Sequence, residues 1–228
     1  NCEPEQRSTS ATAPSNAPVA SREASDGSQS AVVEALARLL AAAAIYPPSH
    51  PRIAAIVEPV QGVAGAVDLG GEWLHALRAR CTATGAMLLF DEVQCGMGRT
   101  GYPFAASMYG VSPDMITTAK ALGAGFPCAA LLLADHVAGH LRIDDLGTTF
   151  GGGPMACAMI ETVVDIIESE GLLANVRKLS QQMRETCVVG PVTGTQGAGF
   201  LLGLRTCRPA KDVQRELLEQ HDILTGTS

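Results

Sequence analysis

Three neighbouring segments decide the fold of this chain: IAAIVE at 53–58, GEWLHALRARCTAT at 71–84 and AMLLFD at 86–91. The first and the last are short apolar runs with the length of a strand, which favours strands that are buried in a sheet. The middle segment has the apolar spacing of a helix. Together they predict a βαβ unit.

Two further apolar runs, at 115–118 and 129–133, extend this series of strands. Strands that alternate with helices are typical of a sheet covered by helices on its faces. The sequence therefore predicts an α/β fold with a mostly parallel sheet.

A change of pattern follows Pro154, where a long helical spacing continues past Gly171 into a second helix that ends near Cys187. The glycine-rich run at 192–205 predicts a pair of strands, and 209–220 predicts a final helix. We expect these elements to form a linker helix and part of a small second domain.

The N-terminal residues 1–30 are dominated by Ser, Ala, Thr, Pro and Glu, so they cannot offset their ordering entropy by burial. We expect this low-complexity segment to be disordered and to be followed by one helix that ends before Pro47. The predicted organisation is therefore a disordered segment at 1–30, part of a large sheet domain at 31–155, and the linker helix with the partial small domain at 156–228.

Composition excludes several classes of protein. The chain has 228 residues, 46% of them hydrophobic, and a net charge of -7 without any basic run, which argues against binding to nucleic acid. Its longest apolar stretches fall short of the roughly 20 residues that a membrane-spanning helix needs. Seven scattered cysteines without a CxxC pair favour reduced thiols, so we expect a cytoplasmic protein.

The residues that could take part in a reaction follow the ends of the apolar runs. Asp91 and Glu92 follow the strand at 86–91 directly, and ligands of open α/β sheets bind at the carboxyl ends of the strands. The alternative is that Asp91 merely caps the next turn. Lys120 lies in an uncharged, glycine-rich setting after the run at 115–118, where desolvation would favour the neutral amine that attacks an aldehyde. The alternative is a lysine at a turn that extends its amine into solvent.

The runs LFDEVQCGMGRTG at 89–101, PDM at 113–115 and AKALG at 119–123 resemble the signature of the class III pyridoxal-phosphate-dependent aminotransferases. VEPVQG at 57–62 is similar to a strand-end motif of that family, and GTTFGG at 147–152 to its glycine-rich loop. Within the family the sequence most resembles acetylornithine and ornithine aminotransferases. The resemblance implies the large domain of a fold type I PLP-transferase with part of its small α/β domain, truncated at both ends.

The resemblance also implies roles for individual residues. Lys120 would hold pyridoxal 5'-phosphate as a Schiff base and then move the proton at the substrate α-carbon. Asp91 would pair with the protonated pyridine nitrogen and keep the ring an electron sink. Glu92 belongs to the same cofactor-binding stretch, in which Val93 would pack against the ring, and Gln94 would bind the phenolic oxygen.

Thr149 resembles the residue that reaches the phosphate of a neighbouring subunit, which implies a homodimer, and Thr148 would lie near the substrate. The implied reaction transfers an amino group between an amino acid or ω-amine and a 2-oxo acid. Val63 stands where ornithine-type enzymes have a glutamate that pairs with an arginine, so the identity of the amino donor stays open.

Two hypotheses of different class remain. The chain is either part of an active transaminase or a truncated relative that folds or binds partners without catalysis. A racemase, decarboxylase or aminomutase would use Lys120 and Asp91 as well. The glycines at 96–101 spell GxGxxG, but no helix is predicted after them, and His136 and His140 lack a third ligand, so neither a dinucleotide site nor a metal site is expected.

Overall fold

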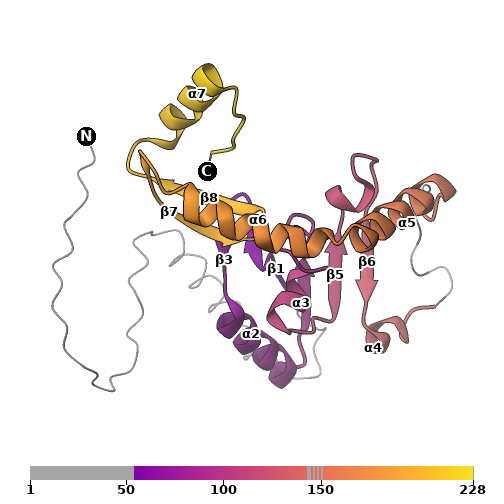
Figure 1. Ribbon diagram of the computed structural model, residues 1–228. Helices are drawn as coiled ribbons and strands as arrows, with labels where there is room; N and C mark the ends of the chain where they lie inside the picture. The colour runs from indigo at the N-terminus through magenta and orange to yellow at the C-terminus, as the bar shows by residue number, and fades with distance from the viewer. Residues whose placement is uncertain (1–53, 143–144, 146, 148, 150, 228) are drawn as a thin grey trace.

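The computed structural model describes residues 54–142, 145, 147, 149 and 151–227. Its largest sheet has the strand order β1-β4-β5-β6 (Figure 1). The bounds of these strands are β1 (Ala54–Val57), β4 (Met87–Asp91), β5 (Met115–Thr118) and β6 (Ala130–Leu133). The first three are parallel and β6 is antiparallel. The predicted α/β fold with a mostly parallel sheet is confirmed, and β6 reverses direction because the link at 119–129 is too short for a parallel crossover.

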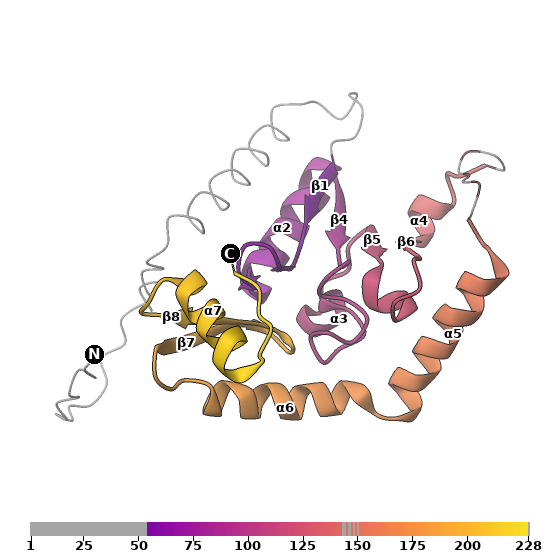
Figure 2. The same cartoon turned by 90° about the horizontal axis from the view of Figure 1, so that it is seen from above.

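Helix α2 (Gly71–Thr84) joins β1 to β4 and covers one face of the sheet (Figures 1 and 2). Its bounds are those that the sequence predicts. The helix ends because Gly85 takes a left-handed conformation, with φ 70°, and closes the last turn. The core beneath it joins apolar residues of the helix to those of the two strands: Ala55, Val57, Leu74, Leu77, Cys81, Leu88 and Phe90.

The opposite face of the sheet is open among the described residues. Burial alternates along β1, and Ile56 is 65% exposed while Val57 is buried. The prediction of buried strands therefore holds for one face of β1 only in the described part of the chain, since α2 covers only one side. Ile56 pairs with Leu89, and successive side chains alternate between faces, so Asp91 lies on this uncovered face.

The C-terminal elements agree with the prediction of two helices, two strands and a helix. They are α5 (Pro154–Ser169), α6 (Leu172–Thr186), β7 (Val192–Ala198), β8 (Leu201–Thr206) and α7 (Ala210–His221). Strands β7 and β8 form an antiparallel hairpin. Figure 2 shows α5 and α6 following one another along the side of the sheet, from the region of β6 to this hairpin. They therefore connect the two parts of the molecule.

Several short elements were not predicted, because a few residues do not establish a periodic pattern. They are the hairpin of β2 (Val60–Gln61) and β3 (Val67–Asp68), helices α3 (Ala105–Tyr109) and α4 (Asp135–Ala138), and the 3₁₀ helix η1 (Lys120–Gly123). The expected disorder at 1–30 and the helix that follows it lie outside the described residues.

Asp114 ties three elements together near the start of β5. It accepts hydrogen bonds from the Leu88 amide at 2.6 Å and Arg78 at 2.8 Å, and it lies 3.0 Å from Nε2 of His136. Burial alone would raise the pKa of Asp114, but the hydrogen bonds and the charges of Arg78 and His136 outweigh it and lower the pKa. His136 thus contacts a carboxylate, and no group of three potential metal ligands occurs in the described ranges.

Within the part of the chain that the structure describes, none of the helices has the length and apolar character to cross a membrane.

The cysteines of the described residues differ in their redox state. Cys81, Cys95, Cys128, Cys157 and Cys187 are free thiols, as their scattered positions predict. Cys207 is disulfide-bonded, so the expectation of reduced thiols is wrong for this cysteine.

Candidate active site

Asp91 is the last residue of β4 and is held at the carboxyl edge of the sheet. The parallel register pairs it with Thr117 of β5. Its Oδ1 accepts a hydrogen bond from Thr117 Oγ1 at 3.0 Å and another from the Val93 amide at 3.1 Å. Among the described residues Oδ2 has no hydrogen bond, so the half-buried carboxylate is fixed in place with one oxygen available.

Glu92 points elsewhere. Its side chain is 1% exposed and accepts hydrogen bonds from the amides of Ala105 at 2.5 Å and Ala106 at 2.8 Å, at the start of α3. Burial raises the pKa of Glu92, and these hydrogen bonds partly offset the increase. The structure therefore places the Glu92 carboxylate against α3, away from Asp91 and its free oxygen.

Val93 and Gln94 lie in the turn that follows β4. The extended conformation that would put Val93 on the face of Asp91 is absent, because the strand ends at Asp91. The amide of Gln94 lies directly over Gly62, where an added Cβ would come within 2.3 Å of Gln94 Oε1. Gly62 also donates a hydrogen bond of 3.3 Å to Glu58. The turn after β4 and the strand-end motif after β1 therefore meet at one edge of the sheet.

Lys120 begins η1, two residues after β5 ends, and so lies at the same edge as Asp91. Its φ of 47° is in the left-handed region, which costs a residue other than glycine about 1–3 kcal/mol. Strain of this kind is concentrated at functional sites. The side chain is exposed and has no hydrogen bond or ion pair with the described residues, so the desolvation that the sequence predicts for Lys120 is not provided by this part of the chain.

The remaining predicted site residues lie on the link between α4 and α5. Thr149 is exposed, and Thr148 lies outside the described residues. Asp91, Gln94 and Lys120 thus lie at the carboxyl edge of the sheet. Thr117 also belongs to this candidate site, although the sequence did not predict it. Only the register of β4 and β5 reveals Thr117, and a register is not visible in the sequence.

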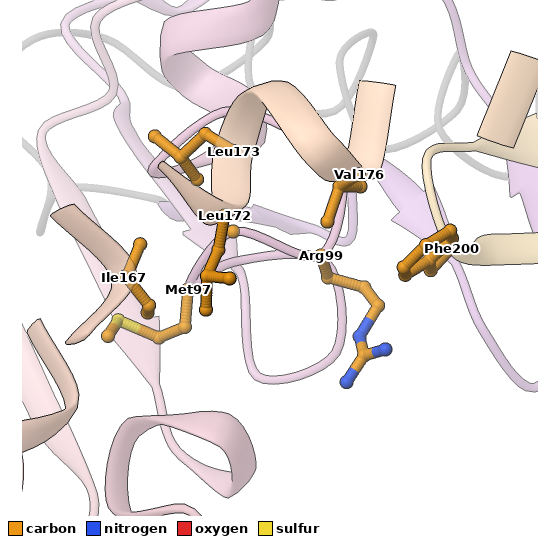
Figure 3. Close-up of a pocket in the computed structure, with 8 residues that line it drawn as sticks. Met97, Arg99, Ile167, Leu172, Leu173, Val176 and Phe200 are labelled. Carbon is orange, nitrogen blue, oxygen red and sulfur yellow. The ribbon is translucent and has the colours of Figure 1, made fainter. Parts of the chain in front are cut away.

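The glycine-rich turn at 96–101 does not form an open phosphate loop. Gly98 and Gly101 are buried, and an added Cβ at Gly101 would come within 2.5 Å of Arg177 on α6. A small, mostly apolar cavity of about 140 Å³ lies between this turn, α5, α6 and the β7–β8 hairpin (Figure 3). It is lined by Met97, Gly98, Arg99, Ile167, Leu172, Leu173, Val176 and Phe200, and by none of the predicted site residues.

Comparison with known proteins shows the family to which this chain belongs. The profile described as "Aminotransferase class-III" matches residues 2–188. The chain belongs to the class-III aminotransferase family. Succinylornithine transaminase of Yersinia enterocolitica is 48% identical over 132 residues, which are 58% of this chain and 32% of that protein. The mitochondrial acetylornithine aminotransferase of Yarrowia lipolytica is 44% identical over 165 residues, 69% of this chain and 40% of that protein.

Solved structures of class-III relatives share the fold. Ornithine aminotransferase of Toxoplasma gondii superposes with a TM-score of 0.71 at 28% identity, over 84% of this chain and 46% of that chain. N-acetylornithine aminotransferase of Stenotrophomonas maltophilia gives a TM-score of 0.64 at 32% identity, over 80% and 46%. The chain spans about a third to two fifths of the length of the curated relatives cited above.

Proposed function

We propose that this class-III chain is part of a transaminase. The enzyme would transfer an amino group between an amino acid or ω-amine and a 2-oxo acid, with pyridoxal 5'-phosphate as cofactor. One observation carries the proposal. A strained, unpaired lysine and a fixed carboxylate lie at the carboxyl ends of the adjacent strands β5 and β4. The crystallised Toxoplasma gondii relative contains PLP at partial occupancy in its active site, which supports the choice of cofactor.

The residues at this edge fit pyridoxal phosphate. The free Oδ2 of Asp91 is suited to a protonated pyridine nitrogen, and the exposed Lys120 amine is suited to an aldehyde carbon. The Gln94 amide over Gly62 offers a hydrogen-bond donor for the phenolic oxygen. When bound, the cofactor supplies an electron sink for charge that develops at the substrate α-carbon.

The chain's own residues then have separate tasks. Lys120 would hold the cofactor, and its amine would afterwards take up and return the proton of the substrate α-carbon. Asp91 keeps the ring nitrogen protonated, because a carboxylate within hydrogen-bond distance raises the pKa of such a base by about 1–3 units. Thr117 and the Val93 amide orient Asp91, and Glu92 orients the turn through its contact with α3.

The wider assembly follows the same proposal. We place residues 31–155 in the cofactor-binding large domain, with 156–228 as linker helix and partial small domain. By the family resemblance, Thr149 would reach the phosphate of a second copy, which would make the working unit a homodimer, and Thr148 would lie near the substrate. The five free thiols among the described residues support a cytoplasmic location, and the disulfide bond of Cys207 counts against it. Val63 is 81% exposed and carries no charge, so amino-donor choice is weaker than in an enzyme with a glutamate there.

The test is a two-step titration of the purified chain. Added pyridoxal phosphate should give the visible absorbance band of a lysine-bound cofactor, an amino acid should discharge that band, and a 2-oxo acid should restore it. Lys178→Ala removes an exposed lysine on α6 and serves as the matched control for Lys120→Ala, which should never develop the band. A band that the amino acid cannot discharge would favour a racemase or another non-transferring reaction.

A further inference from the structure

The turn at 96–101 is built to receive helix α6. Gly98 and Gly101 have φ values of 83° and 86°, and added Cβ atoms would come within 3.0 Å of Leu173 and 2.5 Å of Arg177. Arg177 donates a hydrogen bond to the Gly101 carbonyl, and its guanidinium lies 5.2 Å from the centre of the Tyr102 ring. Close packing on α6, rather than phosphate binding, therefore accounts for these two glycines.

The β7–β8 hairpin contacts the same turn from the side of Phe200 (Figure 3). The Phe200 amide donates to the Arg99 carbonyl at 2.9 Å, and an added Cβ at Gly199 would come within 2.3 Å of that oxygen. Gln196 donates a second contact to the Gly65 carbonyl at 2.6 Å, on the turn between β2 and β3. The hairpin is thus attached at two points to the part of the molecule that carries the site.

Backbone hydrogen bonds continue from the hairpin to the strand end. The Phe200 amide binds the Arg99 carbonyl, the Arg99 amide binds the Gly96 carbonyl at 3.1 Å, and the Gly96 amide binds the Glu92 carbonyl at 3.0 Å. Glu92 is the neighbour of Asp91. The Gly101 amide binds the Gly98 carbonyl at 2.9 Å, so the residue that Arg177 contacts belongs to the same hydrogen-bonded turn as the segment that holds the Asp91 carboxylate.

We propose that Arg177 is a positioning residue, which clamps the 96–101 turn to α6 and thereby fixes the Asp91–Gln94 segment against the cofactor ring. The effect of Arg177 on catalysis rests on the proposed function. The contact of Arg177 with the 96–101 turn is a property of the protein without cofactor. Arg177 is suited to this task because its stem packs over Gly101 while its guanidinium binds the carbonyl of the same residue.

Hydrogen exchange of the 228-residue chain without cofactor tests the clamp. Arg177→Met keeps an apolar stem over Gly101 but removes the donor, and it should speed exchange of the Gly96 and Val93 amides about tenfold. The Leu88 amide, which binds Asp114 in the core, should keep its rate. Lys178→Ala, the neighbouring exposed cation on α6, is the matched control and should change neither rate.

Two outcomes would overturn the proposal. Exchange that changes only at Gly101, or nowhere, would show that the clamp does not reach the strand end. Equal acceleration at Leu88 and Gly96 would make Arg177 a general stabiliser of the fold.

A second readout uses pyridoxal phosphate as the probe, since a displaced Asp91 should shift the visible band in Arg177→Met but not in Lys178→Ala. Failure of Lys120 to bind the cofactor would remove the proposed function and leave the exchange result unaffected.

Discussion

Asp91→Asn is expected to lower the rate of amino-group transfer by about 10- to 1,000-fold while leaving cofactor attachment possible. The carboxylate that keeps the ring nitrogen protonated is worth about 1–3 pKa units, or about 1.4–4 kcal/mol, and the amide has no charge to supply it. Thr117 can still donate to the side-chain oxygen of the introduced amide, so the geometry of the strand end is preserved. The measurement is the rate at which a saturating amino acid discharges the visible band of the cofactor-loaded chain.

Asp165→Asn, an exposed carboxylate on α5, is the control for the loss of one negative charge and should have no effect on this rate. Equal rates in the parent chain and Asp91→Asn would remove Asp91 from the mechanism. Loss of the band itself in Asp91→Asn would instead assign Asp91 to cofactor attachment, which contradicts the role given to Lys120 alone.

Glu92→Ala should destabilise the protein by about 2–5 kcal/mol, because it leaves the buried amides of Ala105 and Ala106 without an acceptor and opens a cavity. Glu92→Gln retains one acceptor oxygen and should lose about half as much. Denaturant unfolding monitored by circular dichroism gives both values. Glu219→Ala, an exposed carboxylate on α7, should stay within about 0.5 kcal/mol of the parent.

A small loss of stability in Glu92→Ala, comparable with Glu219→Ala, would show that α3 does not depend on this carboxylate. The cofactor-binding role implied for Glu92 by its family motif would then regain weight. The structure favours a role in orientation, because both amide contacts lie on the side of α3 and the side chain is almost fully buried.

The longer helices and the C-terminal hairpin could be predicted from the sequence. Helix α2 has its predicted bounds because Gly85 ends it and three buried residues mark its inner face. The helices after Pro154 were predicted from their apolar spacing, and the hairpin of β7 and β8 from its glycine-rich run. The burial of Ile56 in β1 was predicted wrongly, because this apolar side chain faces outward. A sequence does not show which face of a sheet other elements cover.

The positions of Asp91 and Lys120 at the sheet edge could be predicted from the sequence, while their roles in the reaction stay predictions. Asp91 and Lys120 lie at one sheet edge because parallel strands align their carboxyl ends. The extended conformation expected for Val93 is absent, because a turn begins after Asp91, and the Glu92 carboxylate lies against α3. Their roles toward the cofactor stay predictions. Thr117 and Arg177 were missed because their roles depend on strand register and on a contact across 76 residues of sequence.

The most direct test of the account is borohydride reduction of the chain with pyridoxal phosphate, followed by peptide mass mapping. The sequence contains three lysines, Lys120, Lys178 and Lys211, and all of them are exposed, so access alone does not favour any of them. We predict that the pyridoxyl group is fixed on Lys120 at cofactor concentrations that leave the other two lysines unmodified. Equal labelling of the three lysines, or preferential labelling of Lys178 or Lys211, would contradict it.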